Sequence, residues 1–339
     1  MNHSPRIAAL LAPLLSLALL TACTGTNEAQ VTSRLGLINA GGAEIRIVTP
    51  ADNATGTPSS TSATQAVSGA VDLEVLPGGR QMIVAFPDRL ELRDASLKVL
   101  NTLAAPSGVT ACYVRLKASP ARDQVAALSD CGGGAAEQLV VYRSDASLAF
   151  FATLPPPTPS SSDLARFALT SVQTVWLARP ATGGGSELLR VNADGVKVMT
   201  VPPLSAVITD LAMLGGSLYA ATDSGVRLVN QTDGTLSQTP VLSGVFTRLY
   251  GGDSLLAAWL QNAGSQPLTV WNGSKSGSPA SLSDLRDLTF APDGNLYYLS
   301  AAALNGADTV SGLSQNNWRV SSVQTNLSDA RALTWLTSN

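Results

Sequence analysis

The sequence predicts an all-β fold made of about seven repeated units, each with four short strands. Three observations lead to this prediction. Short apolar runs recur along the chain at intervals that average about 43 residues. Turn residues separate these runs in a repeated order, and no stretch sustains the 3.6-residue period of an amphipathic helix.

The most regular run lies at the start of each unit, where alternating apolar residues usually follow one polar residue. Its seven copies begin at Asp72, Tyr113, Arg166, Asp210, Arg248, Asp287 and Ala332. The mean interval of about 43 residues lies within the 40–45-residue period of four-stranded propeller blades. We therefore expect each copy to form the inner strand of one blade.

Turns with defined chemistry follow these runs. Residues 76–80 (LPGGR) and 291–295 (APDGN) combine a proline, which presets φ, with a glycine that accepts positive φ. A third strand then ends in an Asn/Asp/Gly turn, as in residues 192–195 and 230–234. Over residues 34–336 the pattern resembles the β-propeller superfamily of the general WD40-like or NHL-like kind, without a WD dipeptide. A pair of β-sandwiches and a β-solenoid are the alternatives.

The two ends of the repeat predict how the ring closes. The last run, residues 331–336, stands alone, whereas the N-terminal hairpin of residues 34–39 and 44–48 lacks an inner strand. Joining them completes a seventh blade and removes the open sheet edges. The propeller domain is then 34–339, and we interpret residues 50–69 as a long Ser/Thr-rich loop. The fourth strand of the shared blade must then lie in this Ser/Thr-rich stretch before Val71, where the signals for a strand are faint.

The N-terminal segment resembles a bacterial lipoprotein signal peptide. One positive charge, Arg6, precedes an apolar run of residues 7–20, which is too short for a confident membrane span. Leu20-Thr21-Ala22-Cys23 then resembles a lipobox. The resemblance implies a signal peptide of residues 1–22, diacylglycerol (palmitate-type chains) on the Cys23 sulfur, and a lipidated tether of residues 23–33. An ordinary secretory signal with a chance cysteine is the alternative.

This resemblance also implies a location and a first partner. The mature protein would be anchored to a membrane through Cys23 and would face outside the cytoplasm, in the periplasm or at the cell surface. Two or more acyl chains hold a protein stably on a bilayer, whereas one chain binds only marginally.

The two remaining cysteines suggest a disulfide bond. Cys112 and Cys131 flank a turn at residues 120–123 and are equidistant from its centre. Residues placed in this way face each other across a hairpin, and a protein outside the cytoplasm can keep a disulfide. Two unreactive core thiols are the alternative.

Composition excludes several kinds of chemistry. The only histidine, His3, belongs to the predicted signal peptide, so the mature chain has no imidazole for a catalytic triad or a histidine-ligated metal. Acidic residues outnumber basic ones, and no basic cluster is available for nucleic acid. We therefore expect no catalytic set, no cofactor, no metal site and no nucleic-acid partner.

One set of charged residues is a candidate ligand site. If the inner strands surround a channel, their first residues form a ring at one mouth of it. This candidate ring consists of Asp72, Arg166, Asp210, Arg248 and Asp287. Its mixed charges could recognise a small polar or zwitterionic ligand; alternatively, they pair with one another or are solvated.

The resulting functional hypothesis is a binding or scaffolding module that recognises an envelope protein or a small polar ligand. Its support is a rigid disc with loops on two faces, an expected lipid anchor and the lack of a catalytic set. The alternative is an enzyme that uses carboxylates or a bound cofactor, such as a lactonase-like or quinone-dependent propeller.

Overall fold

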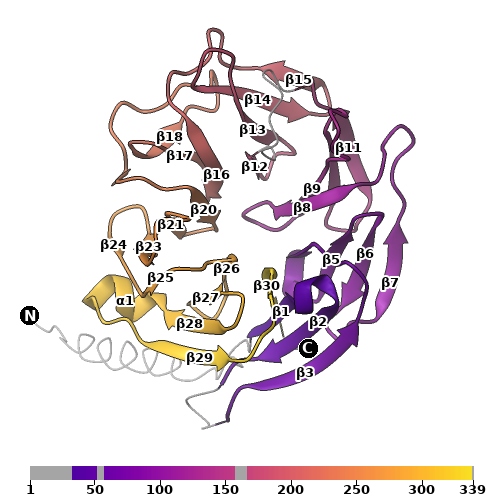
Figure 1. Ribbon diagram of the computed structural model, residues 1–339, viewed down its shortest axis with the longest axis vertical. Coiled ribbons are helices and arrows are strands. Elements are labelled where there is room, and N and C mark those ends of the chain that lie inside the picture. Colours follow the sequence, from indigo (N-terminus) through magenta and orange to yellow (C-terminus); the bar gives the residue numbers. More distant parts are fainter. Residues whose placement is uncertain (1–32, 52–56, 157–165, 338–339) are drawn as a thin grey trace, which may run out of the picture. The chain divides into compact units, whose positions relative to one another are not determined.

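The structure, a computed structural model, describes residues 33–51, 57–156 and 166–337. These residues form seven four-stranded antiparallel sheets arranged as a ring (Figure 1). Each inner strand contacts the inner strand of the next sheet, and the last contacts the first. The predicted seven-bladed β-propeller is confirmed. The expected signal peptide and Cys23 lie outside the described residues.

Blades 1 to 3 run from the inner strand outward in chain order. Blade 1 contains β4 (Asp72–Val75), β5 (Gln81–Phe86), β6 (Arg89–Asp94) and β7 (Val99–Leu103). Blade 2 contains β8 (Tyr113–Ala118), β9 (Gln124–Ser129), β10 (Gln138–Arg143) and β11 (Leu148–Thr153). Blade 3 contains β12 (Arg166–Leu169), β13 (Val175–Pro180), β14 (Ser186–Asn192) and β15 (Gly195–Val198).

Blades 4 to 6 keep this order but have shorter or interrupted outer parts. Blade 4 contains β16 (Ile208–Leu214), β17 (Ser217–Thr222), β18 (Gly225–Val229) and β19 (Leu242–Ser243). Blade 5 contains β20 (Arg248–Gly251), β21 (Leu256–Trp259), β23 (Thr269–Trp271) and β24 (Ser276–Gly277), with the small pair β22 (Gln266–Pro267) and β25 (Ser281–Leu282) beside it. Blade 6 contains β26 (Asp287–Phe290), β27 (Asn295–Leu299), β28 (Leu304–Asp308) and β29 (Val320–Gln324), with the helix α1 (Thr309–Gln315) between the last two.

Blade 7 is shared between the two ends of the repeat, as predicted. Its inner strand is the C-terminal β30 (Ala332–Thr337), and β1 (Ser33–Asn39), β2 (Glu44–Thr49) and β3 (Ser60–Ala66) follow outward. β30 pairs with β1 from Ser33↔Thr337 to Ile38↔Ala332. Short 3-10 turns, η1 (Ala40–Gly42) and η2 (Pro77–Gly79), connect β1 to β2 and β4 to β5.

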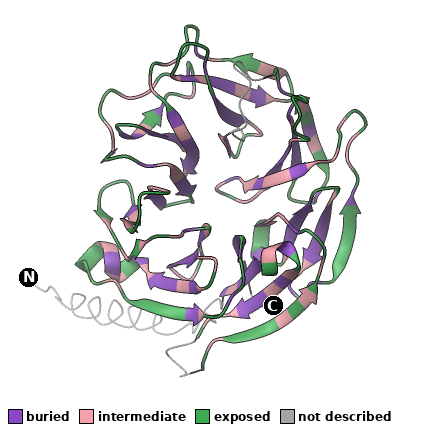
Figure 2. Ribbon diagram, in the orientation of Figure 1, coloured by how far each residue is buried: buried purple, intermediate pink, exposed green. Residues whose placement is uncertain are grey.

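Strand alternation explains how the blades pack. Side chains of successive residues point to opposite faces of a sheet. In β5, Met82, Val84 and Phe86 pack towards blade 7, whereas Ile83 and Ala85 pack towards blade 2. Every junction between neighbouring blades holds one such apolar cluster. The second strands, such as β5 and β9, are therefore apolar on both faces and almost fully buried. Figure 2 shows that the rim strands β3, β7 and β29 are largely exposed.

The outer strands are more exposed, and this corrects one prediction. Residues 50–69, interpreted as a long loop, contain β3, which pairs with β2 from Glu44↔Ala66 to Thr49↔Ser60. The side chains of β3 are mostly exposed. An outer strand at the rim covers little core, so Ser and Thr suffice there and the apolar alternation that marks a strand is missing. The segment thus supplies the fourth strand that the shared blade requires.

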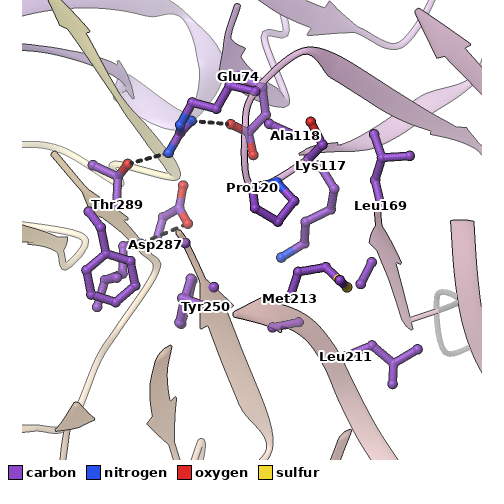
Figure 3. A pocket seen from close by; sticks show the side chains of 18 of the residues that line it. Glu74, Lys117, Ala118, Pro120, Leu169, Leu211, Met213, Tyr250, Asp287 and Thr289 are labelled. Atoms are coloured by element: carbon purple, nitrogen blue, oxygen red, sulfur yellow. Dashed lines mark hydrogen bonds and ion pairs between the residues drawn. The ribbon is translucent and has the colours of Figure 1, made fainter. Parts of the chain in front are cut away.

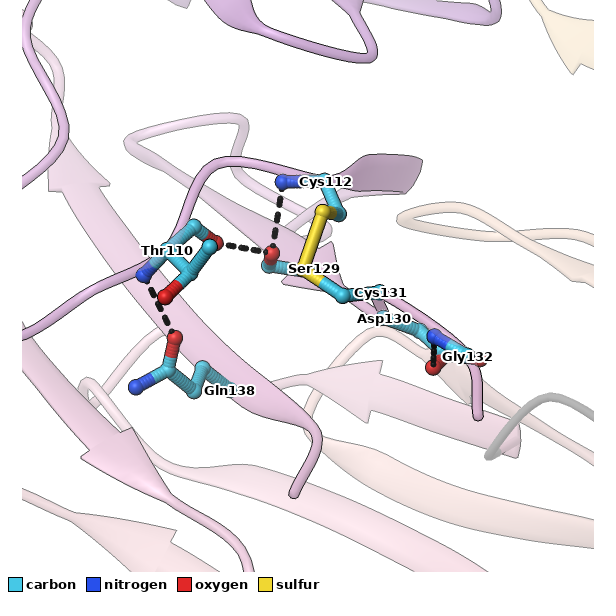
Figure 4. The surroundings of a disulfide bond; sticks show 7 residues. All are labelled: Thr110, Cys112, Ser129, Asp130, Cys131, Gly132 and Gln138. Carbon is cyan, nitrogen blue, oxygen red and sulfur yellow. Dashed lines mark hydrogen bonds between the residues drawn. A yellow bond between two sulfur atoms is a disulfide. The ribbon is translucent and has the colours of Figure 1, made fainter. Parts of the chain in front are cut away.

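The predicted disulfide is confirmed (Figure 4). Cys112 and Cys131 lie just outside β8 and β9, with their Cα atoms 5.0 Å apart. The Asp130 N–H donates to the Cys112 carbonyl at 2.9 Å, and the Cys112 N–H donates to Ser129 Oγ at 3.0 Å. The bond therefore closes the open end of the β8–β9 hairpin.

α1, with seven residues, is the single α-helix in the described part of the chain. No helix there has the length and apolar character needed to cross a membrane.

Candidate functional site in the central channel

The inner strands line a channel in two layers of side chains. We call the residues that begin the inner-strand repeat the first layer, and the residues two positions further along each strand the second layer. Because side chains two positions apart in a strand share a face, both layers face the channel.

The aspartates of the first layer link neighbouring blades through one repeated arrangement. Each carboxylate accepts the N–H of the residue after it and the N–H of a leucine in the next blade. Asp72 binds Leu73 N at 2.9 Å and Leu116 N at 2.7 Å. Asp210 binds Leu211 N and Leu249 N, both at 2.9 Å. Asp287 binds Leu288 N at 2.8 Å and Leu333 N at 2.7 Å.

These bonds give the three aspartates a structural task. They join blade 1 to blade 2, blade 4 to blade 5, and blade 6 to blade 7. Charge-assisted hydrogen bonds to backbone N–H groups are stronger than neutral ones. Of the predicted arginines, Arg248 donates to Gln261 Oε1 at 3.0 Å, and Arg166 begins β12.

The arrangement also reveals a sixth charged member that the sequence pattern missed. The Leu116 N–H donates to an aspartate of the preceding blade, as the N–H groups of Leu249 and Leu333 do in their blades. Arg115, the residue before Leu116, therefore occupies the first-layer position of blade 2, which corresponds to Arg248 in blade 5. The pairing of β8 with β9 shifts register between Tyr113 and Arg115. Tyr113 lies two positions before Arg115, as Ile208 lies two positions before Asp210 in blade 4, where the pairing shifts register in the same way. Tyr113 therefore precedes the repeat and does not begin it.

Burial perturbs two of the first-layer carboxyl groups. Loss of hydration raises the pKa of Asp72 to about 6, and the negative charge of Glu74 adds to this. Burial likewise raises the pKa of Asp287 to about 7, with further repulsion from Asp72 and Glu74. The backbone N–H donors act against both shifts but do not cancel them.

The second layer surrounds a cavity of about 80 Å³ (Figure 3). Glu74, Lys117, Tyr250 and Thr289 contribute polar groups to it. In blades 3 and 4 the second layer consists of small residues, Ala168 and Ala212, which leave space on that side. The volume exceeds the roughly 30 Å³ that one water molecule occupies in the liquid.

Arg122 closes one end of this cavity. It lies in the turn between β8 and β9, with a positive φ of 56°. Its guanidinium contacts Glu74 Oε2 and Thr289 Oγ1, each at 3.4 Å, and its Cζ lies 5.0 Å from the ring centroid of Trp335. Burial lowers the pKa of Arg122, although neighbouring carboxylates oppose the shift. The two hydrogen bonds are long, so they hold the side chain loosely.

Two groups in the cavity lack polar partners within the described ranges. The hydroxyl of Tyr250, a residue only 9% exposed, has no hydrogen bond. Burial strongly raises the pKa of Tyr250, and Asp287, Arg248, Asp210 and Arg115 also influence it. The Lys117 ammonium lies 5.8 Å from the Tyr250 ring centroid and has no ion pair there.

A wider groove of about 900 Å³ lies outside Arg122, on the face where inner strands turn into second strands. The cavity and the groove share Pro120, Arg122, Gly252 and Phe290 as lining residues. Turns from blades 1, 2, 5 and 6, the side of α1 and Trp335 of blade 7 form the groove. Together the two spaces form a funnel that narrows into the channel.

The sequence predicted the first layer except for Arg115, and it did not predict the second. The signal for the second layer was present, because Glu74, Lys117, Tyr250 and Thr289 each lie two residues after a first-layer position. Arg122 was interpreted only as part of a turn. No group of three or more His, Cys, Asp or Glu side chains suited to a metal ion occurs among the described residues.

Comparison with known proteins supports the fold and nothing finer. No protein-family model matches the sequence, and a search of curated proteins finds no match. Among solved structures, the chain is similar to a 6-phosphogluconolactonase candidate from Bacteroides fragilis, with 10% identity and a TM-score of 0.60 over 92% of this chain and 99% of that one. It is also similar to Citrobacter koseri AztD, with 11% identity and a TM-score of 0.56 over 91% and 99% of the two chains.

A third similar structure is PorZ of Porphyromonas gingivalis, described as an essential bacterial surface component of the type-IX secretion system. The identity is 12%, the TM-score is 0.57, and the match covers 84% of this chain but only 36% of PorZ. At these identities the similarities establish a shared propeller fold, and a fold hosts many unrelated functions.

Proposed function

We propose that this protein is a lipid-anchored binding module of the bacterial cell envelope, whose propeller recognises a partner through the groove. The observation that carries the proposal is the groove itself. Its volume of about 900 Å³ lies at the upper end of the 300–1,000 Å³ range typical of ligand sites. It gathers turns from four blades around Arg122, with Trp335 of a fifth blade beside them.

The helix α1 gives the groove a firm wall. Trp318, just after α1, packs against Gly312 of the helix, where a Cβ atom would clash with its ring, and closely against Gly277 of β24. This packing fixes α1 against blade 5. Val310 of α1 lines the groove and is 67% exposed. Together with the half-buried rings of Phe290 and Trp335, it gives the groove the apolar and aromatic lining that is common in recognition surfaces.

The envelope location rests on Leu20-Thr21-Ala22-Cys23 after an apolar run. PorZ is a precedent for a propeller of this kind in a bacterial surface component. Mass spectrometry of the native protein tests the anchor. We expect an acylated N-terminal Cys23, and an unmodified N-terminus or cleavage at another residue would contradict the proposal.

Photo-crosslinking in intact cells tests the groove, with a matched pair of variants. Val310→Asp places a charge in the groove, at a helix N-terminus that tolerates acids. Val172→Asp places the same charge on a residue that is 77% exposed and lies in the β12–β13 turn, outside the groove. We expect Val310→Asp to lose a crosslinked partner that Val172→Asp retains. Equal crosslinking by both variants would contradict the proposal.

The proposal assigns no catalytic step to the propeller. Lactone hydrolysis by the purified protein, or a quinone that co-purifies with it, would favour the enzyme alternative instead.

A further inference from the structure

We propose that the cavity behind Arg122 is a subsite for a single carboxylate group. The inference deepens the proposed function, because it names the chemistry that the funnel recognises at its narrow end, and it rests on that function. The carboxylate belongs either to a small organic acid or to an acidic side chain of a partner that lies in the groove.

The charged groups in the cavity that already have partners determine which sign of charge a ligand must carry. Glu74 already contacts Arg122, and both oxygens of Asp287 accept backbone N–H groups. The Lys117 ammonium lies 5.8 Å from the Tyr250 ring centroid and forms no ion pair with any described residue. The charge available for a new partner is therefore positive.

The Tyr250 hydroxyl supplies the second, independent observation. It is buried without a hydrogen-bond partner in the described part of the chain, and such a group is costly unless something satisfies it. A hydroxyl can donate to an anionic oxygen. Lys117 and Tyr250 come from blades 2 and 5 and meet across the channel, so a carboxylate between them can accept from both.

Size and access fit one carboxylate rather than a larger group. The cavity of about 80 Å³ holds more than one water molecule but no large ligand. Its entrance lies between Pro120, Arg122, Gly252 and Phe290, where it meets the groove. A carboxylate that enters from the groove passes the Arg122 guanidinium, whose two long hydrogen bonds are easily exchanged.

Titration of the mature protein with ¹³C-acetate, followed by NMR line broadening, tests the subsite. Lys117→Met keeps the length of the side chain and removes its charge, and Tyr250→Phe removes only the hydroxyl. We expect saturable acetate binding that weakens about tenfold or more in Lys117→Met and several-fold in Tyr250→Phe, in line with charge-assisted and neutral hydrogen bonds. Methylammonium, a cation of similar size, should not bind saturably.

Two controls separate binding from folding. Lys197→Met removes an exposed lysine of β15 and should leave acetate affinity unchanged. Lys117→Arg restores the positive charge and should bind acetate more tightly than Lys117→Met. Absence of saturable acetate binding by the unmodified protein, or equal affinity in Lys117→Met and Lys197→Met, would overturn the inference.

The source of the carboxylate is decided by combining this titration with the crosslinking experiment. If the partner provides the group, Lys117→Met loses both acetate binding and the crosslink. If a small acid provides it, Lys117→Met loses acetate binding and retains the crosslink. If acetate does not bind but the crosslink still depends on Val310, the subsite alone is overturned. If acetate binds but the crosslink does not depend on Val310, the proposed function alone is overturned.

Discussion

The two layers of the channel contain similar residue types but differ in what their polar groups contact. In the first layer, Asp72, Asp210 and Asp287 each accept two backbone N–H groups, one of them from the next blade. In the second layer, Lys117 and the Tyr250 hydroxyl lack polar partners within the described ranges. The comparison teaches that charge in a propeller channel does not by itself indicate a ligand site.

The difference has a physical cause in the strand geometry. First-layer side chains lie where the inner strands begin, beside backbone N–H groups of the adjacent blade. Second-layer side chains lie two residues further along the inner strands, where the small residues of blades 3 and 4 leave a cavity. Changes in the first layer should therefore affect stability, whereas changes in the second layer should affect binding.

The largest effect is expected from removing β30, because this strand closes the ring and contributes residues to both layers of the channel. Truncation after Ser328 deletes the N–H that Asp287 binds and the Thr334 hydroxyl that accepts from Val75 N at 3.2 Å. It also exposes apolar faces of blades 1 and 6. We expect loss of the cooperative thermal transition.

A chain that ends at Thr337 is the control for this truncation and should melt like the full-length protein. Equal melting temperatures for the two truncated chains would show that ring closure contributes little.

The disulfide should have the next largest effect, because the β8–β9 hairpin carries both layers of blade 2. Cys112 and Cys131 are 19 positions apart, and a loop of this length corresponds to about 3 kcal/mol in the chain-entropy model. The double variant Cys112→Ser/Cys131→Ser should lose about that much unfolding free energy in urea. An unchanged denaturation midpoint would refute this contribution.

Removal of a first-layer carboxylate should cost somewhat less. Asp210→Ala leaves two buried N–H groups, of Leu211 and Leu249, without their acceptor, at a cost of about 2 kcal/mol. The exposed Asp88, whose carboxylate pairs with the Arg89 guanidinium at 2.8 Å, provides the control variant Asp88→Ala. We expect that control to stay within about 0.5 kcal/mol of the original protein. Equal unfolding free energies for both variants would contradict the structural role of the layer.

The pH dependence of stability should show a smaller effect with a defined sign. The pKa of Asp287 is about 7 in the folded protein, against an ordinary value of 3.8. Between these values the folded state holds a proton that the unfolded state releases, so stability from this group is full below about pH 4 and falls as the pH rises through about 7. Asp72, with a pKa of about 6, acts in the same direction.

Urea unfolding of the original protein and of Asp287→Asn across pH 4–8 measures this effect. The difference in unfolding free energy between the two should shrink as the pH rises. A difference that grows with pH would mean that the carboxylate is stabilised, rather than destabilised, by its surroundings.

The sequence predicted most of the fold because the repeat is carried by buried strands. The period, the shared blade and the disulfide all follow from apolar alternation and turn residues, which burial enforces. β3 could be expected only because the shared blade needs a fourth strand, since its exposed Ser and Thr residues show no such alternation. Sequence spacing alone could not show the bulge before Arg115 either, because it depends on cross-strand register.

The site was predicted less well, for a related reason. The first-layer positions were identified, yet their hydrogen bonds reach into neighbouring blades and cannot be inferred from one repeat. The cavity depends on which second-layer residues are small, and on Arg122 in a turn from blade 2. Both are properties of the closed ring rather than of a single strand.

The most direct test of the contrast between the layers compares Asp210→Asn with Tyr250→Phe by two measurements on each variant. Urea unfolding reports stability, and acetate titration reports the cavity. Asp210 does not line the cavity, whereas Tyr250 does. The account predicts that Asp210→Asn loses stability and still binds acetate, while Tyr250→Phe keeps its stability and binds acetate several-fold more weakly. The opposite pattern, or the same loss in both variants, would contradict it.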